Sequence, residues 1–440
     1  MCVILVGFCV REDLWGVTSF VRALGLQPVC YDRLLDLFHS SALNLDTLTR
    51  LWAMLLVNFH PGVLTCNGRR VLVCDGIKVP KAGKKMPGVK RLKQPSESNT
   101  KPESILGHSC QAVGILVQCL SSVVCIPLTA RIHEGVVFSN RDQRTLLDKM
   151  IELIALLAIP DDFYVIADAF YASCKIALPL LRSGQHLVTR VRNNAVGYVP
   201  APQPERRKPG RPRVYGKKVP LKTLFDRSQD TQLLPSPVYG ESGVELCVWT
   251  ADLLWRPVGL LVRFVAVLHP TRGRIILMTT DLAMAPLDLI RLYGYRFKIE
   301  VSFKSALRVV GAYLYHFWMA DMVSITRKAR DQYLHRKTDS YRDAVRRKLA
   351  AYHRFIQLGL TAQGIMLALA TTVPQLVWKS FGSWLRTLRT GIVPSESVVA
   401  CALRNSLPHF LTDNAVDPDL AKFIQEKLDL ENTNARRLAA

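Results

Sequence analysis

Residues 163–191, FYVIADAFYASCKIALPLLRSGQHLVTRV, decide the fold class of this chain. FYVIAD and QHLVTRV are short β-branched apolar runs, which predict two strands, and SCKIALPLLRSG between them predicts a helix. Upstream, residues 71–74 predict another strand, AVGILVQCL and SVVCIPLTARI predict a hairpin, and QRTLLDKMIELIALL predicts an amphipathic helix. The order is three strands, helix, strand, helix, strand. It predicts an α/β fold.

Further elements flank this region on both sides. The N-terminal residues carry apolar side chains at three- and four-residue steps, and we expect Asn44 or Asp46 to cap a helix there. After Arg192 comes a stretch rich in Pro, Arg and Lys. The alternating runs ELCVWTADLLW, GLLVRFVAVLH and RIILMTT follow it and predict a β-rich insertion. Helix is expected again from Pro286, in the basic region 327–354, and in the C-terminal part.

The charge of the chain favours a nucleic-acid partner. Lys and Arg number 58 against 35 Asp and Glu, which gives a net charge of +23. Cationic side chains that neutralise phosphates release counterions, so binding to nucleic acid is strong and salt-dependent. The alternative is a generally cationic soluble protein, but here the positive charge is clustered. The 11 cysteines include no C-x-x-C pair and lie mostly in apolar runs, which indicates a reducing compartment and argues against a zinc site.

Residues 355–378 contain no charged side chain and are long enough to span a bilayer. They include Gln357, Gln363 and Pro374 as well as several threonines. We therefore expect a buried core helix here, and an integral membrane protein is the alternative that this stretch leaves open.

Three acidic residues are candidates for a catalytic metal site. Asp75 follows the apolar run RVLVC, Asp168 follows FYVIA, and Glu300 lies in LYGYRFKIEVSFK, a helical pattern with basic and aromatic neighbours. Parallel strands bring such strand-end carboxylates to one edge of a sheet, and carboxylates are the usual ligands of Mg²⁺. The alternative is that the aspartates cap turns and that Glu300 makes ordinary i,i+4 pairs.

One helical face carries the remaining candidates. At about 100° per residue, the third acid shares a face with cations and a tyrosine, a pattern that suits contacts to DNA phosphates. The residues on this face are Tyr293, Arg296, Glu300, Lys304, Leu307 and Arg308.

Together these residues resemble the DDE transposases of bacterial insertion sequences. The branch that fits is the Y-R-E-K type of insertion-sequence family four, with the signature Y-x2-R-x3-E-x6-K. Tyr293, Arg296 and Glu300 occupy its first three positions, while Leu307 stands at the fourth, with Arg308 beside it. The order of strand, strand and helix that carries the acids also agrees, and the β-rich stretch falls where this branch has an insertion.

The resemblance implies an RNase H-like mixed sheet flanked by helices, and a metal-dependent reaction on DNA. Asp75, Asp168 and Glu300 would be catalytic and would bind Mg²⁺, with Mn²⁺ as a substitute. Water and then a DNA 3′-hydroxyl would attack phosphodiesters at the transposon ends and at the target. The implied partners are double-stranded DNA and a second copy of the chain, with no membrane, and the implied location is the bacterial cytoplasm near the nucleoid.

The resemblance also divides the chain into regions with expected roles. In order these are a DNA-end-binding helical region, the first part of the catalytic core, the β-rich insertion with a basic loop, the second part of the core with the Glu helix and basic helices, and a C-terminal helical region for dimerisation. Their boundaries are 1–66, 67–192, 193–285, 286–350 and 351–440.

Basic segments complete the expected DNA surface. KPGRPRVYGKK resembles an AT-hook, a minor-groove reader, although a solvated basic loop explains it about as well. The lysines after the first strand are expected to face phosphates. The named candidates in these two segments are Lys78, Lys84, Lys85, Arg211, Arg213 and Lys217. A DNA-binding protein that descends from a transposase but is catalytically silent is the remaining alternative.

Overall fold

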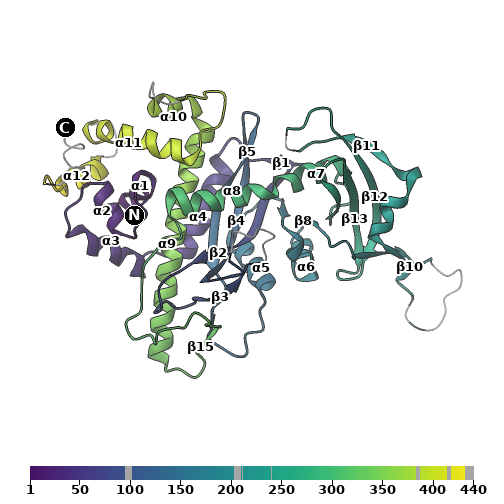
Figure 1. Cartoon of the computed structure of the whole chain (residues 1–440), viewed down its shortest axis with the longest axis horizontal. Helices are drawn as coiled ribbons and strands as arrows, with labels where there is room; N and C mark the ends of the chain where they lie inside the picture. Colours follow the sequence, from purple (N-terminus) through teal and green to yellow (C-terminus); the bar gives the residue numbers. More distant parts are fainter. Residues whose placement is uncertain are drawn as a thin grey trace.

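One large mixed sheet organises the protein. The computed structural model describes residues 1–94, 102–202, 210, 212–238, 240–382, 387–413 and 418–431. The segments 95–101 and 203–209 and residue 211 lie outside this description. Most described strands belong to a 13-stranded sheet with helices on both faces (Figure 1).

The centre of this sheet has the order β5-β4-β2-β7-β8. β2, β4 and β5 are antiparallel, whereas β7 and β8 run parallel to β2. This is the RNase H-like arrangement, and it confirms the predicted order of strands and helices. The strands are β2 (Arg69–Pro80), β4 (Ser104–Cys119), β5 (Ser122–Ile132), β7 (Phe163–Ile166) and β8 (His186–Arg190).

The strand that carries Asp75 is longer than predicted. We expected a short strand that ends at Asp75, but β2 continues to Pro80. Ile77 and Val79 are buried, so the alternation of apolar and polar residues continues beyond the acid. β4 pairs along this extension as far as Gly107 opposite Pro80. Asp75 therefore lies within β2, and the expected loop begins only after Pro80.

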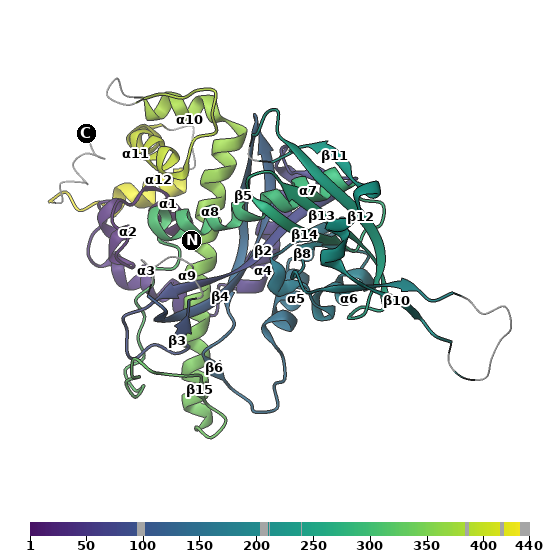
Figure 2. The ribbon, with the colours of Figure 1, turned by 45° about the vertical axis from the view of Figure 1, so that its right-hand side comes forward.

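The β-rich insertion extends the same sheet. β14 pairs antiparallel with β8, and the order then runs β14-β13-β12-β9-β10 to the edge (Figure 2). The three alternating runs form β12, β13 and β14, as predicted. The strands of this part are β9 (Val196–Pro200), β10 (Tyr215–Pro220), β11 (Gln232–Pro235), β12 (Glu245–Trp255), β13 (Leu260–His269) and β14 (Gly273–Thr279). The short helices are η2 (Leu221–Asp226) and η3 (Ser228–Asp230).

Different helices cover the two faces of the central sheet. Leu72 and Cys74 point to one face, where they share a core with α4, α5 and α6. Val71 and Val73 point to the other face, where α7 and α8 supply the apolar partners. The helices are α4 (Leu45–Phe59), α5 (Leu146–Leu156), α6 (Cys174–Arg182), α7 (Pro286–Gly294) and α8 (Lys298–Ser305). Asn44 caps α4 through Thr47 N at 2.9 Å, one of the two predicted caps.

Helices from both ends of the chain pack together in one cluster beside the sheet (Figure 1). Leu26 forms a β-bridge with Leu428, and Gln27 N donates to Lys427 O at 2.8 Å. The N-terminal and C-terminal regions thus share a core. The cluster contains α1 (Cys2–Val10), α2 (Thr18–Ala23), α3 (Cys30–His39), α9 (Asp339–Thr372), α10 (Pro374–Phe381), α11 (Glu396–Thr412) and α12 (Pro418–Glu426).

α9 runs between this cluster and the sheet (Figures 1 and 2). Among the described residues it is the helix long and apolar enough to cross a membrane, but 72% of its most apolar window is buried inside the protein. This burial agrees with the predicted core helix. The predicted helix over 327–354 is wrong in its first part, because α9 begins at Asp339, where the Thr338 hydroxyl accepts from Tyr341 N.

Short elements complete the fold. They are β1 (Thr65–Cys66), β3 (Lys90–Lys93), β6 (Val136–Val137), β15 (Gln332–Tyr333), η1 (Ala169–Tyr171), η4 (Tyr295–Phe297) and the π-helical turn η5 (Ala306–Val310).

Candidate active site

The parallel register places Asp75 and Asp168 at the same level of the sheet. Val73 is paired with Ile166, and each aspartate lies two residues further along its strand direction. Side chains two apart on a strand share a face, so Asp75 points to the face that α7 and α8 cover. Asp168 also caps a turn, because its carboxylate accepts from Phe170 N at 3.0 Å.

The helical segment α7-η4-α8 brings the third acid to this place. Arg296 donates from Nη1 to Asp75 Oδ2 at 3.2 Å and from Nη2 to Glu300 Oε1 at 2.7 Å. Its guanidinium therefore joins two carboxylates that are far apart in the sequence. The i,i+4 pair that the alternative interpretation required is also formed, but it is shared with Asp75.

The field at Asp75 favours a proton or another cation. Burial, together with the neighbouring carboxylates of Asp168 and Glu300, raises the pKa of Asp75 to about 6, although Gly76 N–H and Arg296 act in the opposite direction. All three acids thus lie close enough to interact. Burial and repulsion both disfavour the charged form of Asp75, and a bound cation compensates that charge.

The donor set fits a hard divalent cation in its chemistry. All three groups are carboxylates, the ligands that Mg²⁺ and Mn²⁺ take in proteins, and Asp75 is buried beside like charges. As the side chains stand, no group of three His, Cys, Asp or Glu residues in the described part of the chain is arranged to hold a metal. The guanidinium of Arg296 supplies the positive charge between Asp75 and Glu300 instead.

Comparison with known proteins identifies the family. The family model described as "DDE superfamily endonuclease" matches residues 4–238, more than half of the chain. This chain belongs to the DDE superfamily endonucleases. The match includes Asp75 and Asp168 and ends before Glu300. Endonucleases of this superfamily depend on divalent metal ions.

Similarity to solved structures is distant. The piggyBac transposase in a synaptic complex with hairpin DNA is 13% identical with a TM-score of 0.38, over 97% of this chain and 74% of that one. The NurA nuclease from Sulfolobus solfataricus is 10% identical with a TM-score of 0.25, over 64% of this chain and 94% of that one. No curated protein matches this DDE endonuclease.

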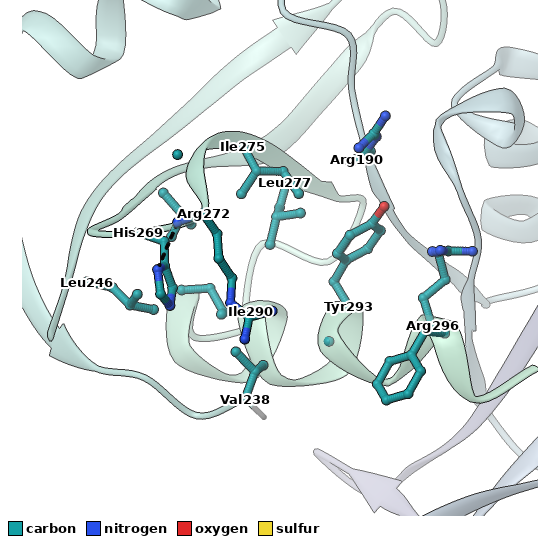
Figure 3. A pocket seen from close by; sticks show the side chains of 14 residues that line it. Arg190, Val238, Leu246, His269, Arg272, Ile275, Leu277, Ile290, Tyr293 and Arg296 are labelled. Carbon is teal, nitrogen blue, oxygen red and sulfur yellow. Dashed lines mark hydrogen bonds between the residues drawn. The ribbon is translucent and has the colours of Figure 1, made fainter. Parts of the chain in front are cut away.

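A cavity of about 290 Å³ lies beside the acids of this DDE endonuclease, between the insertion strands and α7 (Figure 3). Arg190, Tyr293 and Leu277 line this cavity together with Arg296, whose guanidinium contacts Asp75. Phe297 lines it as well. Burial raises the pKa of Tyr293, although Arg296 and Arg190 lower it, so its hydroxyl stays protonated and can donate to a phosphate.

Sequence reasoning missed Arg190. This residue ends β8 and lies opposite Leu277 in the register. A signal was available, because β8 is parallel to β2 and β7 and its carboxyl end must reach the sheet edge that carries Asp75 and Asp168.

Among the basic residues predicted on the Glu helix, Lys304 and Arg308 are exposed. Leu307, at the fourth position of the Y-R-E-K signature, packs against the helical core instead. The π-helical turn Ala306–Val310 begins between Lys304 and Leu307. Arg308 is thus an exposed cation next to the position where the signature has lysine.

The other predicted basic residues lie away from the acids. Lys78 is exposed and alternates to the opposite face of β2 from Asp75. Lys84 and Lys85 follow the end of β2, where their carbonyl oxygens accept from Ile325 N and Met319 N. In the AT-hook-like segment, Arg213 and Lys217 are exposed near β10, and Arg211 lies outside the described residues.

Proposed function

We propose that this DDE endonuclease is a transposase of the Y-R-E-K type from a bacterial insertion sequence. It binds the terminal inverted repeats of its element as double-stranded DNA, cuts them and joins them to a target. One observation carries the proposal: Asp75 and Asp168 stand level on parallel strands, and Arg296 of the Y-x2-R-x3-E motif joins Asp75 to Glu300.

Asp75, Asp168 and Glu300 are the catalytic residues in this account and would hold Mg²⁺, with Mn²⁺ as a substitute. When bound, such ions activate the attacking oxygen and stabilise the leaving oxygen of a phosphodiester. Arg296 carries a planar guanidinium that suits a phosphate as well as a carboxylate. Tyr293 and Arg190 line the same cavity and would donate to the adjacent phosphate, so the scissile bond is held beside the acids.

The attacking group comes from water or DNA in this account, because the nearby thiol is unsuited to the role. Cys74 is fully buried, and burial raises its pKa well above the usual value, so it stays protonated. A covalent protein–DNA intermediate through this cysteine is therefore not expected. Two DNA ends must be cut together, so we also propose a homodimer on DNA, in the cytoplasm near the nucleoid.

A catalytically silent DNA-binding protein is the second candidate. It is favoured by the ion pairs of Arg296, whose single positive charge already compensates part of the negative charge of Asp75 and Glu300. Strand breaks in a supercoiled plasmid that carries the element's ends distinguish the candidates. The transposase makes such breaks in Mg²⁺, whereas the silent protein binds the same plasmid and leaves it intact.

The role of the acids is tested by Asp168→Asn. We expect this variant to lose cleavage of the transposon ends in Mg²⁺, because an amide is a neutral and much weaker metal ligand, while its affinity for the ends changes little. Asp162→Asn is the matched control, since Asp162 precedes the other end of β7, is 59% exposed and pairs with Arg69. Unchanged cleavage by Asp168→Asn would remove the residue from the active site.

A further inference from the structure

In the segment that follows the Glu helix in the sequence, buried and more exposed side chains alternate. Along residues 313–319, Tyr313, Tyr315, Phe317 and Met319 are at most 6% exposed, and the residues between them face outward or lie at the surface. Trp318 is 57% exposed. A tryptophan in such a position exposes a large apolar area to water, which indicates a binding surface.

The buried row is fixed by several polar contacts. Tyr315 stacks on Tyr352 with ring centroids 4.6 Å apart, and its hydroxyl lies 2.6 Å from His108 Nδ1. Lys81 Nζ donates to the Tyr315 carbonyl at 3.3 Å and lies 3.6 Å from the centre of the Tyr315 ring. Tyr352 also donates to Phe317 O at 2.6 Å. The outward row therefore stands on a rigid base, which lowers the entropy cost of binding.

Trp15, from the segment between α1 and α2, adds a third ring to the outward-facing His316 and Trp318. Trp15 is 71% exposed, and its ring stacks on His316 at 6.5 Å with an interplanar angle of 25°. His316 in turn meets Trp318 edge-on at 6.0 Å. We name Trp15, His316 and Trp318 the aromatic platform.

Cations surround the aromatic platform. Lys85 donates from Nζ to the carbonyl oxygen of Ala320, two residues after Trp318, at 2.7 Å. A cavity of about 310 Å³ on one side of Trp318 is lined by Arg347 and Lys348. A second cavity, of about 600 Å³, is lined by Lys81, which contacts Tyr315, and by Lys84, Arg91, Arg327 and Lys328. The acids near the platform along the chain are Asp321, which is exposed, Asp13, which pairs with Arg22, and Glu12, which pairs with Arg404.

We propose that the aromatic platform binds unpaired nucleotides of single-stranded DNA. Exposed rings beside cations form the surface that single strands use, because every base has a face that stacks and every phosphate a charge that pairs. A duplex keeps its base faces stacked inside and offers fewer of them. The dense positive charge also disfavours an apolar protein partner.

This proposal deepens the proposed nuclease function and rests on it. β2 runs on from Asp75 to Pro80, and Lys81, which holds the buried row, follows it, ~20 Å from Asp75 at ~3.3 Å per residue. A DNA strand that is unpaired near the acids therefore reaches the platform over several nucleotides. The platform would hold this strand away from the duplex being cut.

The test is binding of a short fluorescent oligothymidylate, followed by anisotropy in EDTA. We expect Trp318→Leu to weaken binding about tenfold and Trp318→Phe to retain most of it, since phenylalanine still stacks. Phe59→Leu is the matched control, because Phe59 is 78% exposed at the end of α4 and is not part of the platform. Binding of a blunt duplex should change much less than binding of the single strand.

Three outcomes overturn the proposal. They are unchanged binding by Trp318→Leu, an equal loss of single-strand and duplex binding, and a change in oligomeric state by sedimentation with no change in single-strand affinity, which would make the platform a protein contact. The assay contains no divalent metal and measures binding alone. Its failure is therefore independent of the cleavage result for Asp168→Asn.

Discussion

Asp75 combines burial with a concentration of negative charge. Its side chain is 18% exposed, it accepts from Gly76 N at 2.7 Å, and it shares Arg296 with Glu300. Even with these partners, burial and the neighbouring carboxylates raise its pKa to about 6. The charged form of Asp75 therefore destabilises the metal-free protein and favours binding of a cation.

The raised pKa predicts how stability depends on pH. A carboxyl group whose folded pKa exceeds its unfolded value of about 4 stabilises the fold below that value, and this contribution is lost as pH rises to about 6. The asparagine of Asp75→Asn has no ionisable group, so the variant should not lose this contribution to stability between about pH 4 and about pH 6. At pH 8 in EDTA we expect the free energy of unfolding of Asp75→Asn to be about 2 kcal/mol larger than that of the unsubstituted protein.

Urea unfolding in EDTA at pH 4 and pH 8 checks this prediction. Asp161→Asn serves as the control, because Asp161 is 45% exposed and forms a surface ion pair with Arg70. A stability difference between Asp75→Asn and the unsubstituted protein that is equal at the two pH values would show that the pKa is not raised.

At the scale of elements, a buried arginine ties the N-terminal helices to the end of the Glu helix. Arg11 is 2% exposed and donates to Val310 O and Gly311 O, the carbonyls at the end of η5. Its guanidinium also lies 4.6 Å from the Phe8 ring centre and 4.8 Å from that of Phe20. Cations are favoured at the carbonyl end of a helix, so this contact fixes the segment that carries Glu300.

Replacement of Arg11 by methionine should therefore be costly. Methionine fills similar space, but it leaves the buried carbonyls of Val310 and Gly311 without these donors, and we expect a loss of about 3 kcal/mol of stability in thermal unfolding. Arg22→Met is the control, because Arg22 pairs with Asp13 at the surface and should lose less than about 1 kcal/mol. Equal effects of the two substitutions would contradict the structural role of Arg11.

Most elements were predictable because their patterns are local. The alternation in β12, β13 and β14 and the strand-helix-strand run around Asp168 are complete within short windows. The end of β2 was misplaced because Asp75 and Gly76 interrupt an apolar run, and only pairing with β4 shows that the strand continues. Residues 327–338 contain helix-compatible charges, but they are held by other contacts, such as Gln332 N to Gly135 O at 2.9 Å.

The site was predictable in part. Asp75, Asp168 and Glu300 could be chosen from their positions after strands and within a motif. The level register of the two aspartates and the ion pairs of Arg296 depend on long-range packing, which no local pattern encodes. Trp15 and His316 are far apart in the sequence, so the aromatic platform had no sequence signal.

At the scale of the whole molecule, distant segments build one site. β2 and β7 supply two acids from the sheet, and the insertion strands β9–β14 separate them in sequence from the helix that carries the third. The shared core of the N- and C-terminal helices, with α9 against the sheet, holds that helix in place. The central claim is therefore that Asp75, Asp168 and Glu300 form a single site for a divalent cation.

Calorimetric titration of the whole chain with Mn²⁺ tests this claim most directly. We predict saturable binding that Asp75→Asn, Asp168→Asn and Glu300→Gln each weaken by about tenfold or more, since even outer-shell changes cost metal sites ten- to a hundredfold in affinity. Asp162→Asn should bind as the unsubstituted protein does. Binding that survives all three substitutions, or no binding by the unsubstituted chain, would contradict the account.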